Sequence, residues 1–322
     1  MEKTYRAINW NVLDDALDKA VWEKLTEQFW LDTRIPLSND LNDWKKMKEE
    51  EHALVEKVFG GLTLLDTLQS VDGMSALKKD ALTSHEAAVL NNIEFMESVH
   101  AKSYSSIFST LNTPAEIEEI FEWTEKNEYL QYKAEKICAI YRGDDALMKK
   151  AASVFLESFL FYSGFYAPLY FLGHNRLNNV AEIIKLILRD ESVHGTYIGY
   201  KFQIRYRALA EEEQEKLKFE IVNLLYDLYQ NEEKYTHELI QRERQFLFNE
   251  LSDVGIFLRY NANKALMNLG FEPLFEETVT DVNPVVMNGI STSTSNHDFF
   301  SQVGNGYLLG SVEAMGDDDY WI

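Results

Sequence analysis

The feature that most constrains the fold of this chain is a pair of Glu-x-x-His steps, each preceded by a lone carboxylate. Residues at positions i, i+3 and i+7 share one face of an α-helix, and around both steps that face is otherwise apolar. The two sets are Asp66 with Glu97 and His100, and Glu157 with Glu191 and His194. The spacings of 31 residues in the first set and 34 in the second suit antiparallel helix pairs that return to the same level.

Carboxylates on apolar helix faces conflict with burial, because an unpaired charge in a protein core costs several kcal/mol. Two divalent metal ions among the four carboxylates would resolve that conflict. One carboxylate from each of two helices, with Glu-x-x-His from each of two others, is the arrangement of ferritin-like di-iron and di-manganese bundles. The sequence therefore predicts an all-α, ferritin-like helical bundle with a dimetal-carboxylate site in its core.

Composition favours the same fold class. The 322 residues include only 5 prolines and 15 glycines, and 46% of them are apolar. Residues 1–38 are expected to be irregular. Helices are expected at about 40–70, 84–111, 114–141, 145–172, 178–208 and 211–250, with a shorter one ending near 269. No lysine or arginine follows Lys264, so we expect a helical domain over 1–282 and a flexible acidic tail over 283–322.

The bulk charge argues against two classes of partner. A net charge of −22 and a pI near 4.7 disfavour nucleic acid and anionic membrane surfaces. The first ten residues contain no apolar secretory signal, and no window is apolar for the roughly eighteen residues of a membrane span. A soluble cytoplasmic protein is therefore expected. The single cysteine, Cys138, excludes an internal disulfide and is expected to be a core residue rather than a reactive thiol.

Two further pairs of acidic residue and histidine fit a helical spacing but are interpreted as surface groups. Glu49-Glu50-Glu51-His52 lies beside Lys45, Lys46 and Lys48, which is typical of a solvated face. His237 follows Glu233 by four residues and is expected to form a surface pair with it.

Tyr104 lies one helical turn beyond His100 on the ligand face. A tyrosine on an apolar stripe is usually a core residue with a hydrogen-bonded hydroxyl, but beside a redox-active metal pair it is a candidate for oxidation to a tyrosyl radical. Phe161, Phe165 and Ile187 would then provide a dry apolar wall. Carboxylate and imidazole ligands suit iron and manganese alike. Such sites store iron, activate dioxygen or oxidise a protein side chain.

With these residues in place, the sequence resembles the small, radical-generating subunit of class I ribonucleotide reductase. The resemblance covers about residues 20–322. The six ligands match in order, type and spacing, and Tyr104 falls four residues after His100. The chain is most similar to the class Ib form, on segments that include Trp30 to Ser38 and the Gly-Tyr-Leu-Leu-Gly sequence around Tyr307.

The resemblance implies a role for each site residue. One metal would be held by Asp66, Glu97, His100 and Glu191, and the other by Glu97, Glu157, Glu191 and His194. Trp30 would belong to the radical path, and Asp190 would link it by hydrogen bonds to His100; from the residues alone, Trp30 is a core residue and Asp190 a surface charge. Tyr307 would pass the radical onward, and the acidic end, 317–322, would dock on the large subunit.

The same resemblance implies the function and the partners. The chain would store a radical on Tyr104 and deliver it to a large catalytic subunit that reduces ribonucleotides to deoxyribonucleotides. It would use two manganese or two iron ions, form a homodimer and be activated by a flavodoxin-like protein. The alternative is a ferritin-like oxidase or metal-storage protein, although a storage protein needs neither Trp30 nor an acidic aromatic tail. A purely structural metal site is disfavoured, because this ligand set is more typical of redox chemistry.

Overall fold

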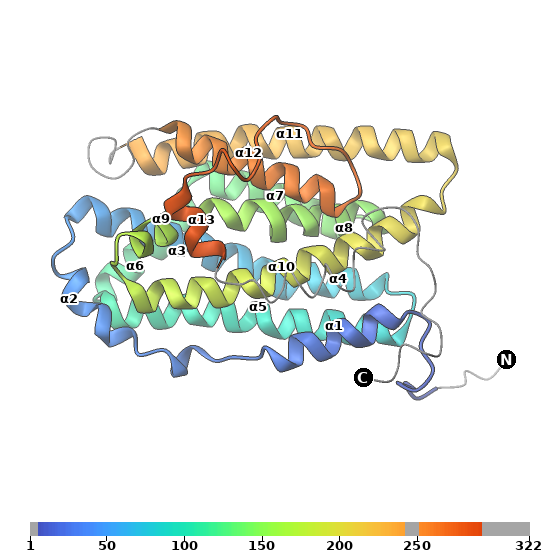
Figure 1. Cartoon of the computed structure of the whole chain (residues 1–322), viewed down its shortest axis with the longest axis horizontal. Helices are drawn as coiled ribbons and strands as arrows, with labels where there is room; N and C mark the ends of the chain where they lie inside the picture. Colours follow the sequence, from blue (N-terminus) through green and yellow to red (C-terminus); the bar gives the residue numbers. More distant parts are fainter. Residues whose placement is uncertain (1–5, 242–250, 292–322) are drawn as a thin grey trace.

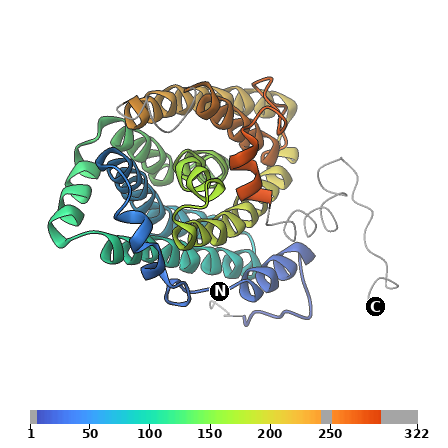
Figure 2. The same cartoon turned by 60° about the vertical axis from the view of Figure 1, so that its left-hand side comes forward.

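The computed structural model describes residues 6–241 and 251–291, which are helical with no strand among them. Long helices lie side by side in Figure 1, and Figure 2 looks more nearly along them. The described helices are α1 Ala16–Glu27, α2 Leu41–Trp44, α3 Glu49–Leu68, α4 Met74–Lys79, α5 Ser84–Leu111, α6 Pro114–Lys126, α7 Glu128–Arg142, α8 Ala146–Phe155, α9 Phe161–Gly173, α10 Asn178–Arg207, α11 Glu211–Gln241, α12 Leu251–Asn268 and α13 Pro284–Ser291. The prediction of an all-α, ferritin-like bundle is confirmed.

The centre of the bundle is the segment from α8 to α9, which the other helices surround in Figure 2. Nearly every residue from Ala151 to Tyr162 is buried, including Phe155, Phe159 and Phe161. Such a helix, apolar on all sides, must be covered on all sides. Helices α3 and α10 both pack against this segment, and α5 packs against α3 and α10. The four predicted ligand-bearing segments are therefore neighbours.

Local signals explain the best-defined helix boundaries. Thr83 caps α5 by accepting a hydrogen bond from the backbone N–H of Glu86 at 3.0 Å. Thr113 and Glu116 form a capping box on α6, with Pro114 at the first helical position, as the sequence predicts. These caps fix where α5 and α6 begin.

Other boundaries differ from the expectation. Residues 1–38 are not wholly irregular, because α1 buries Leu17, Val21 and Leu25 along one face. The helix expected from about 40 begins as α2 and restarts as α3 at Glu49. Two π-helical segments interrupt the α-helices: η3 Gln69–Gly73 follows α3, and η4 Leu156–Leu160 separates α8 from α9. Such segments are frequent at functional sites.

The first part of the expected tail is helical. Helix α13 buries Val286, and a side chain at Gly173 would overlap Val285, so α13 packs against the end of α9. Residues 292–322 lie outside the described residues, and the expectations for Tyr307 and the acidic end fall there. The division at 282/283 stays a prediction, with ordered helix beyond it. Within 6–241 and 251–291, no helix is both long and apolar enough to cross a membrane.

Candidate metal centre

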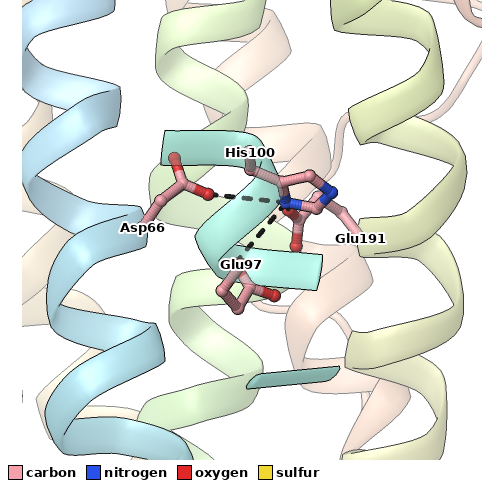
Figure 3. A group of neighbouring side chains, drawn as sticks. All are labelled: Asp66, Glu97, His100 and Glu191. Carbon is pink, nitrogen blue, oxygen red and sulfur yellow. Dashed lines mark ion pairs between the residues drawn. The ribbon is translucent and has the colours of Figure 1, made fainter. Parts of the chain in front are cut away.

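The predicted ligands of one ion converge from three helices. Figure 3 shows Asp66 from α3, Glu97 and His100 from α5, and Glu191 from α10, all turned toward one another. A second group comprises Glu97, Glu157, Glu191 and His194, with Glu157 supplied by η4. In each group, one ligand atom per residue lies within 4.8 Å of the others. The structure thus brings all six residues of the predicted set into two overlapping groups.

Glu97 and Glu191 belong to both groups, and each turns one carboxylate oxygen toward each of the two imidazoles. Nδ1 of His100 lies 3.0 Å from Oε1 of Glu191 and 3.6 Å from Oε2 of Glu97. Nδ1 of His194 lies 2.8 Å from Oε1 of Glu97 and 3.6 Å from Oε2 of Glu191. A carboxylate that turns different oxygens toward two ligand groups is placed to bridge two metal ions. Asp66 and Glu157 lie at opposite ends, 3.6 and 3.5 Å from the imidazole of their own group.

These ligand atoms are buried, and most of them make no hydrogen bond. Within the described part of the chain, the atoms without a partner include both oxygens of Asp66, Glu97 and Glu191, Oε2 of Glu157, and Nδ1 of both histidines. Leaving so many buried polar atoms unsatisfied would cost far more than a native core tolerates. Oxygen and nitrogen donors of this kind suit iron and manganese. The residues present therefore fit a dimetal centre.

The titration behaviour of the cluster agrees with that fit. Burial, together with the charge of Glu97, raises the pKa of both Asp66 and Glu157 well above its usual value. Burial alone would lower the pKa of His100 and His194, but the surrounding carboxylates raise both pKa values. The cluster therefore retains protons, which divalent cations would displace on binding.

One of the histidines is connected to the N-terminal segment through Asp190. Oδ2 of Asp190 lies 3.1 Å from Nε2 of His100 and accepts a hydrogen bond from Nε1 of Trp30 at 2.7 Å. The other oxygen accepts from the side-chain amide of Gln28 at 2.8 Å. Asp190 is fully buried, so its interpretation from the residues alone as a surface charge is wrong. With Nε2 of His100 as the donor to Asp190, Nδ1 faces the ligand group.

Tyr104 lies in a dry position beside the first group. Its side chain is fully buried and its ring stacks on Phe59 with 5.7 Å between centroids. Its hydroxyl has no hydrogen-bond partner among residues 6–241 and 251–291. Burial and the charges of Asp66 and Glu191 raise its pKa well above the usual value, which keeps the phenol neutral. The residues expected to form a dry wall, Phe161, Phe165 and Ile187, are all fully buried.

Comparison with known proteins agrees with this geometry. The profile of the family described as "Ribonucleotide reductase, small chain" matches residues 7–284. This chain belongs to that family. Two relatives are each 51% identical to it over 98% of its length: ribonucleoside-diphosphate reductase 2 subunit beta of Escherichia coli K12, of which 97% is covered, and ribonucleoside-diphosphate reductase subunit beta of Mycobacterium leprae, of which 95% is covered.

Two solved structures superpose on this chain. The dimanganese(II)-NrdF crystal structure from Streptococcus sanguinis is 67% identical and has a TM-score of 0.87, covering 89% of this chain and all of that one. A putative class I ribonucleotide reductase from Bacillus halodurans is 23% identical with a TM-score of 0.76, covering 88% of this chain and all of that one. The second similarity supports the fold alone.

Two residues around the predicted ligands, Gln28 and Gln69, were not expected from the sequence. Gln28 contacts Asp190, and Gln69 donates a hydrogen bond to Oε1 of Glu157. Gln69 follows Asp66 by three residues, so it lies one turn away on the same helical face. That spacing is the only sequence signal for its position; its other partners, Tyr141 and Ser153, come from distant parts of the chain.

The expected surface motif at Glu49–His52 is partly buried. Glu51 is only 7% exposed and pairs with Arg176 through two hydrogen bonds of 2.8 Å. His52 stacks on Trp44 with 4.0 Å between ring centroids. The prediction of a solvated face is therefore wrong for Glu51. Cys138 is buried, as expected for a core residue.

Proposed function

We propose that this chain is the small subunit of a ribonucleoside-diphosphate reductase, which stores a radical on Tyr104 and delivers it to a separate large subunit. The observation that carries the proposal is the combination around His100. A buried tyrosine without a hydrogen bond lies one turn away, and a hydrogen-bonded connection leads through Asp190 to Trp30. The family and its relatives' names support the same activity.

The centre would hold two manganese or two iron ions. Asp66, Glu97, His100 and Glu191 would hold the ion nearer Tyr104, and Glu97, Glu157, Glu191 and His194 the other. The dimanganese form of the Streptococcus sanguinis structure supports manganese. When bound and oxidised, the metal pair supplies the oxidising power that removes one electron from the protein.

Tyr104 would give up that electron together with its phenolic proton, because the neutral phenol is the form that its surroundings favour. The product is a neutral tyrosyl radical. Full burial keeps water and reductants away from the radical, and no described residue makes a hydrogen bond with the hydroxyl. The Tyr104 pocket therefore serves to preserve the radical between turnovers.

Turnover would move one electron toward Tyr104, which recovers its electron and proton while a cysteine of the large subunit is oxidised. Within this chain the electron would pass Trp30, whose indole N–H is held by Asp190. Stacking of the Trp30 and His100 rings, with 6.0 Å between centroids, shortens the path. Tyr307, outside the described residues, would continue it.

The partners follow from the family and from the resemblance to class Ib. The chain would form a homodimer and dock on the large subunit through its acidic end, 317–322. A flavodoxin-like protein would deliver the oxidant. Deleting 316–322 is expected to abolish reduction of ribonucleotides with the large subunit while the Tyr104 radical is retained; unchanged turnover would refute the docking role.

The test of the radical site is electron paramagnetic resonance of the reconstituted protein. Tyr104→Phe is expected to lose the tyrosyl signal while two metal ions remain bound. Tyr197→Phe is a matched control, because Tyr197 is also fully buried but bonds to Asp18 at 2.8 Å. A full signal in Tyr104→Phe would contradict the assignment. Uptake of many iron ions per chain without a radical would favour the metal-storage alternative.

A further inference from the structure

We propose that Gln69 is a positioning residue that allows Glu157 to offer only one oxygen to the metal centre. The proposal rests on the metal centre proposed above and deepens it. It concerns the half of the centre that the connection from His100 to Trp30 does not reach.

Gln69 makes hydrogen bonds through both ends of its amide. Its nitrogen donates to Oε1 of Glu157 and to Oγ of Ser153, the latter at 2.8 Å. Its oxygen accepts from the hydroxyl of Tyr141 at 2.6 Å. All four side chains are buried. Metal binding requires Glu157 to be ionised, and a buried hydrogen bond to a charged carboxylate is stronger than one between neutral groups, so in that state the amide holds Glu157 firmly.

The partners of Gln69 determine which end of its amide faces which group. A carboxylate that binds a metal ion is ionised and can only accept, so a metal-bound Glu157 requires the NH₂ group of the amide and not its oxygen. Tyr141 makes this orientation favourable, because its O–H donates to the amide oxygen. If the amide turned over, its oxygen would face a carboxylate oxygen. Tyr141 therefore orients Gln69, and Gln69 in turn orients Glu157.

The two oxygens of Glu157 are consequently not equivalent. Oε1 is occupied by the Gln69 amide, whereas Oε2 has no hydrogen-bond partner and lies 3.5 Å from Nδ1 of His194. Among the described residues only Oε2 lacks a hydrogen-bond partner, so it is the oxygen that we assign to the ion. By contrast, both oxygens of Asp66, at the other end of the centre, are without a partner. The two ends of the centre therefore differ in how far their terminal carboxylates can rearrange.

The backbone is adapted to this contact. Gln69 begins η3 and Glu157 lies in η4, so both residues come from π-helical segments. At Gly73, in the same segment as Gln69, an added Cβ would overlap Oε1 of Gln69 and lie 2.9 Å from Cε2 of Tyr141. Any side chain there would displace the amide from Tyr141. Glycine at this position is explained by the close approach.

The test is a titration of the metal-free protein with Mn²⁺. Electron paramagnetic resonance measures the free Mn²⁺ and the signal of the spin-coupled pair. Gln69→Met keeps an unbranched side chain but removes the amide. Loss of a group that orients a metal ligand weakens binding by about 10–100-fold, so the affinity for the second ion is expected to fall by that factor and the coupled signal to change. Gln203→Met, which removes another buried amide that contacts no ligand, is expected to bind both ions as the wild type does.

A second variant separates positioning from general destabilisation. Tyr141→Phe leaves the Gln69 amide present but no longer oriented. It is expected to lower the affinity for the second ion by less than Gln69→Met does. The double variant should bind the second ion no more weakly than Gln69→Met alone, since both changes act on the same contact. If Gln69→Met does not fold, Tyr141→Phe and Gly73→Ala carry the test through the same measurement.

The possible failures are distinguishable. If the wild type binds two ions and the variants bind them with the same affinities and the same coupled signal, the positioning role of Gln69 is refuted. If the wild type itself binds fewer than two ions, the dimetal centre is refuted instead.

Discussion

Three buried tyrosines of this chain differ in what their hydroxyl groups contact, and the difference predicts opposite effects of the same substitution. Tyr104 is fully buried, and its hydroxyl has no hydrogen-bond partner among the residues that the structure describes. Tyr141 is 4% exposed and donates to Gln69 at 2.6 Å, and Tyr197 is fully buried and donates to Asp18 at 2.8 Å. Replacing each by phenylalanine preserves the ring and removes only the hydroxyl.

The expected magnitudes follow from these contacts. A buried hydroxyl without a partner costs about 1–3 kcal/mol, so Tyr104→Phe should raise the free energy of unfolding by about 1–2 kcal/mol. Tyr141→Phe should lower it by about 1–3 kcal/mol, because the oxygen of the Gln69 amide is left unpaired. Tyr197→Phe removes a hydrogen bond to a charged group and should lower it by about 1.5–3 kcal/mol.

The assay is equilibrium unfolding in urea with a chelator present, which separates these effects from metal binding. All four proteins must be compared at one protein concentration, because the stability of a dimer depends on it. A Tyr104→Phe protein less stable than the wild type by more than about 1 kcal/mol would show that the hydroxyl has a partner. In that case the argument that the phenol is isolated, and so protects a radical, would be wrong.

Three further predictions concern other buried contacts. Lys133→Met should lower the free energy of unfolding by about 3–5 kcal/mol, because the buried Glu232 then lacks the ammonium group 2.9 Å away. The double variant Lys133→Met with Glu232→Leu should recover most of the lost stability. Urea unfolding measures both effects. Hydrogen bonding to Arg176 lowers the pKa of Glu51. The stability that this carboxylate contributes is therefore complete above pH 4.5 and is lost as the pH falls through its lowered pKa. In Arg176→Met, the free energy of unfolding should depend less on pH in that range. Asp190→Asn should leave the stored radical visible by electron paramagnetic resonance but slow turnover with the large subunit, and turnover at the wild-type rate would contradict its place in the radical path.

The sequence predicts well which side chains come together around His100, because helical periodicity acts within one segment. Glu97 and His100 lie three residues apart on one apolar face of α5, and the structure places them in one group. The bounds of that helix were also predicted, because the expected range 84–111 matches α5, whose caps are Thr83 and Asn112. A period of 3.6 and a cap are local properties, so they can be read without knowing what the helix packs against.

The interpretation of Asp190 from periodicity fails for the opposite reason. It is adjacent to Glu191 on α10, about 100° around the helix from the ligand face, where an isolated helix would expose it. Its burial comes from Gln28 and Trp30, which lie 162 and 160 residues away in the sequence. The pattern within α10 contains no signal that a distant segment buries Asp190. Only the resemblance to a family predicted the connection of Asp190 with Trp30.

The two ligand groups repeat each other in sequence but not in hydrogen bonding. On the His100 side, Nε2 contacts Asp190, and through it Trp30. On the His194 side, Nε2 has no hydrogen-bond partner within the described part of the chain, and the supporting contact is that of Gln69 with Glu157. An internal duplication of ligands explains why the centre can hold two ions. The unequal surroundings explain why a radical path would leave from the His100 side: that histidine alone is joined to a redox-active side chain, while the opposite side is arranged to hold a ligand in place.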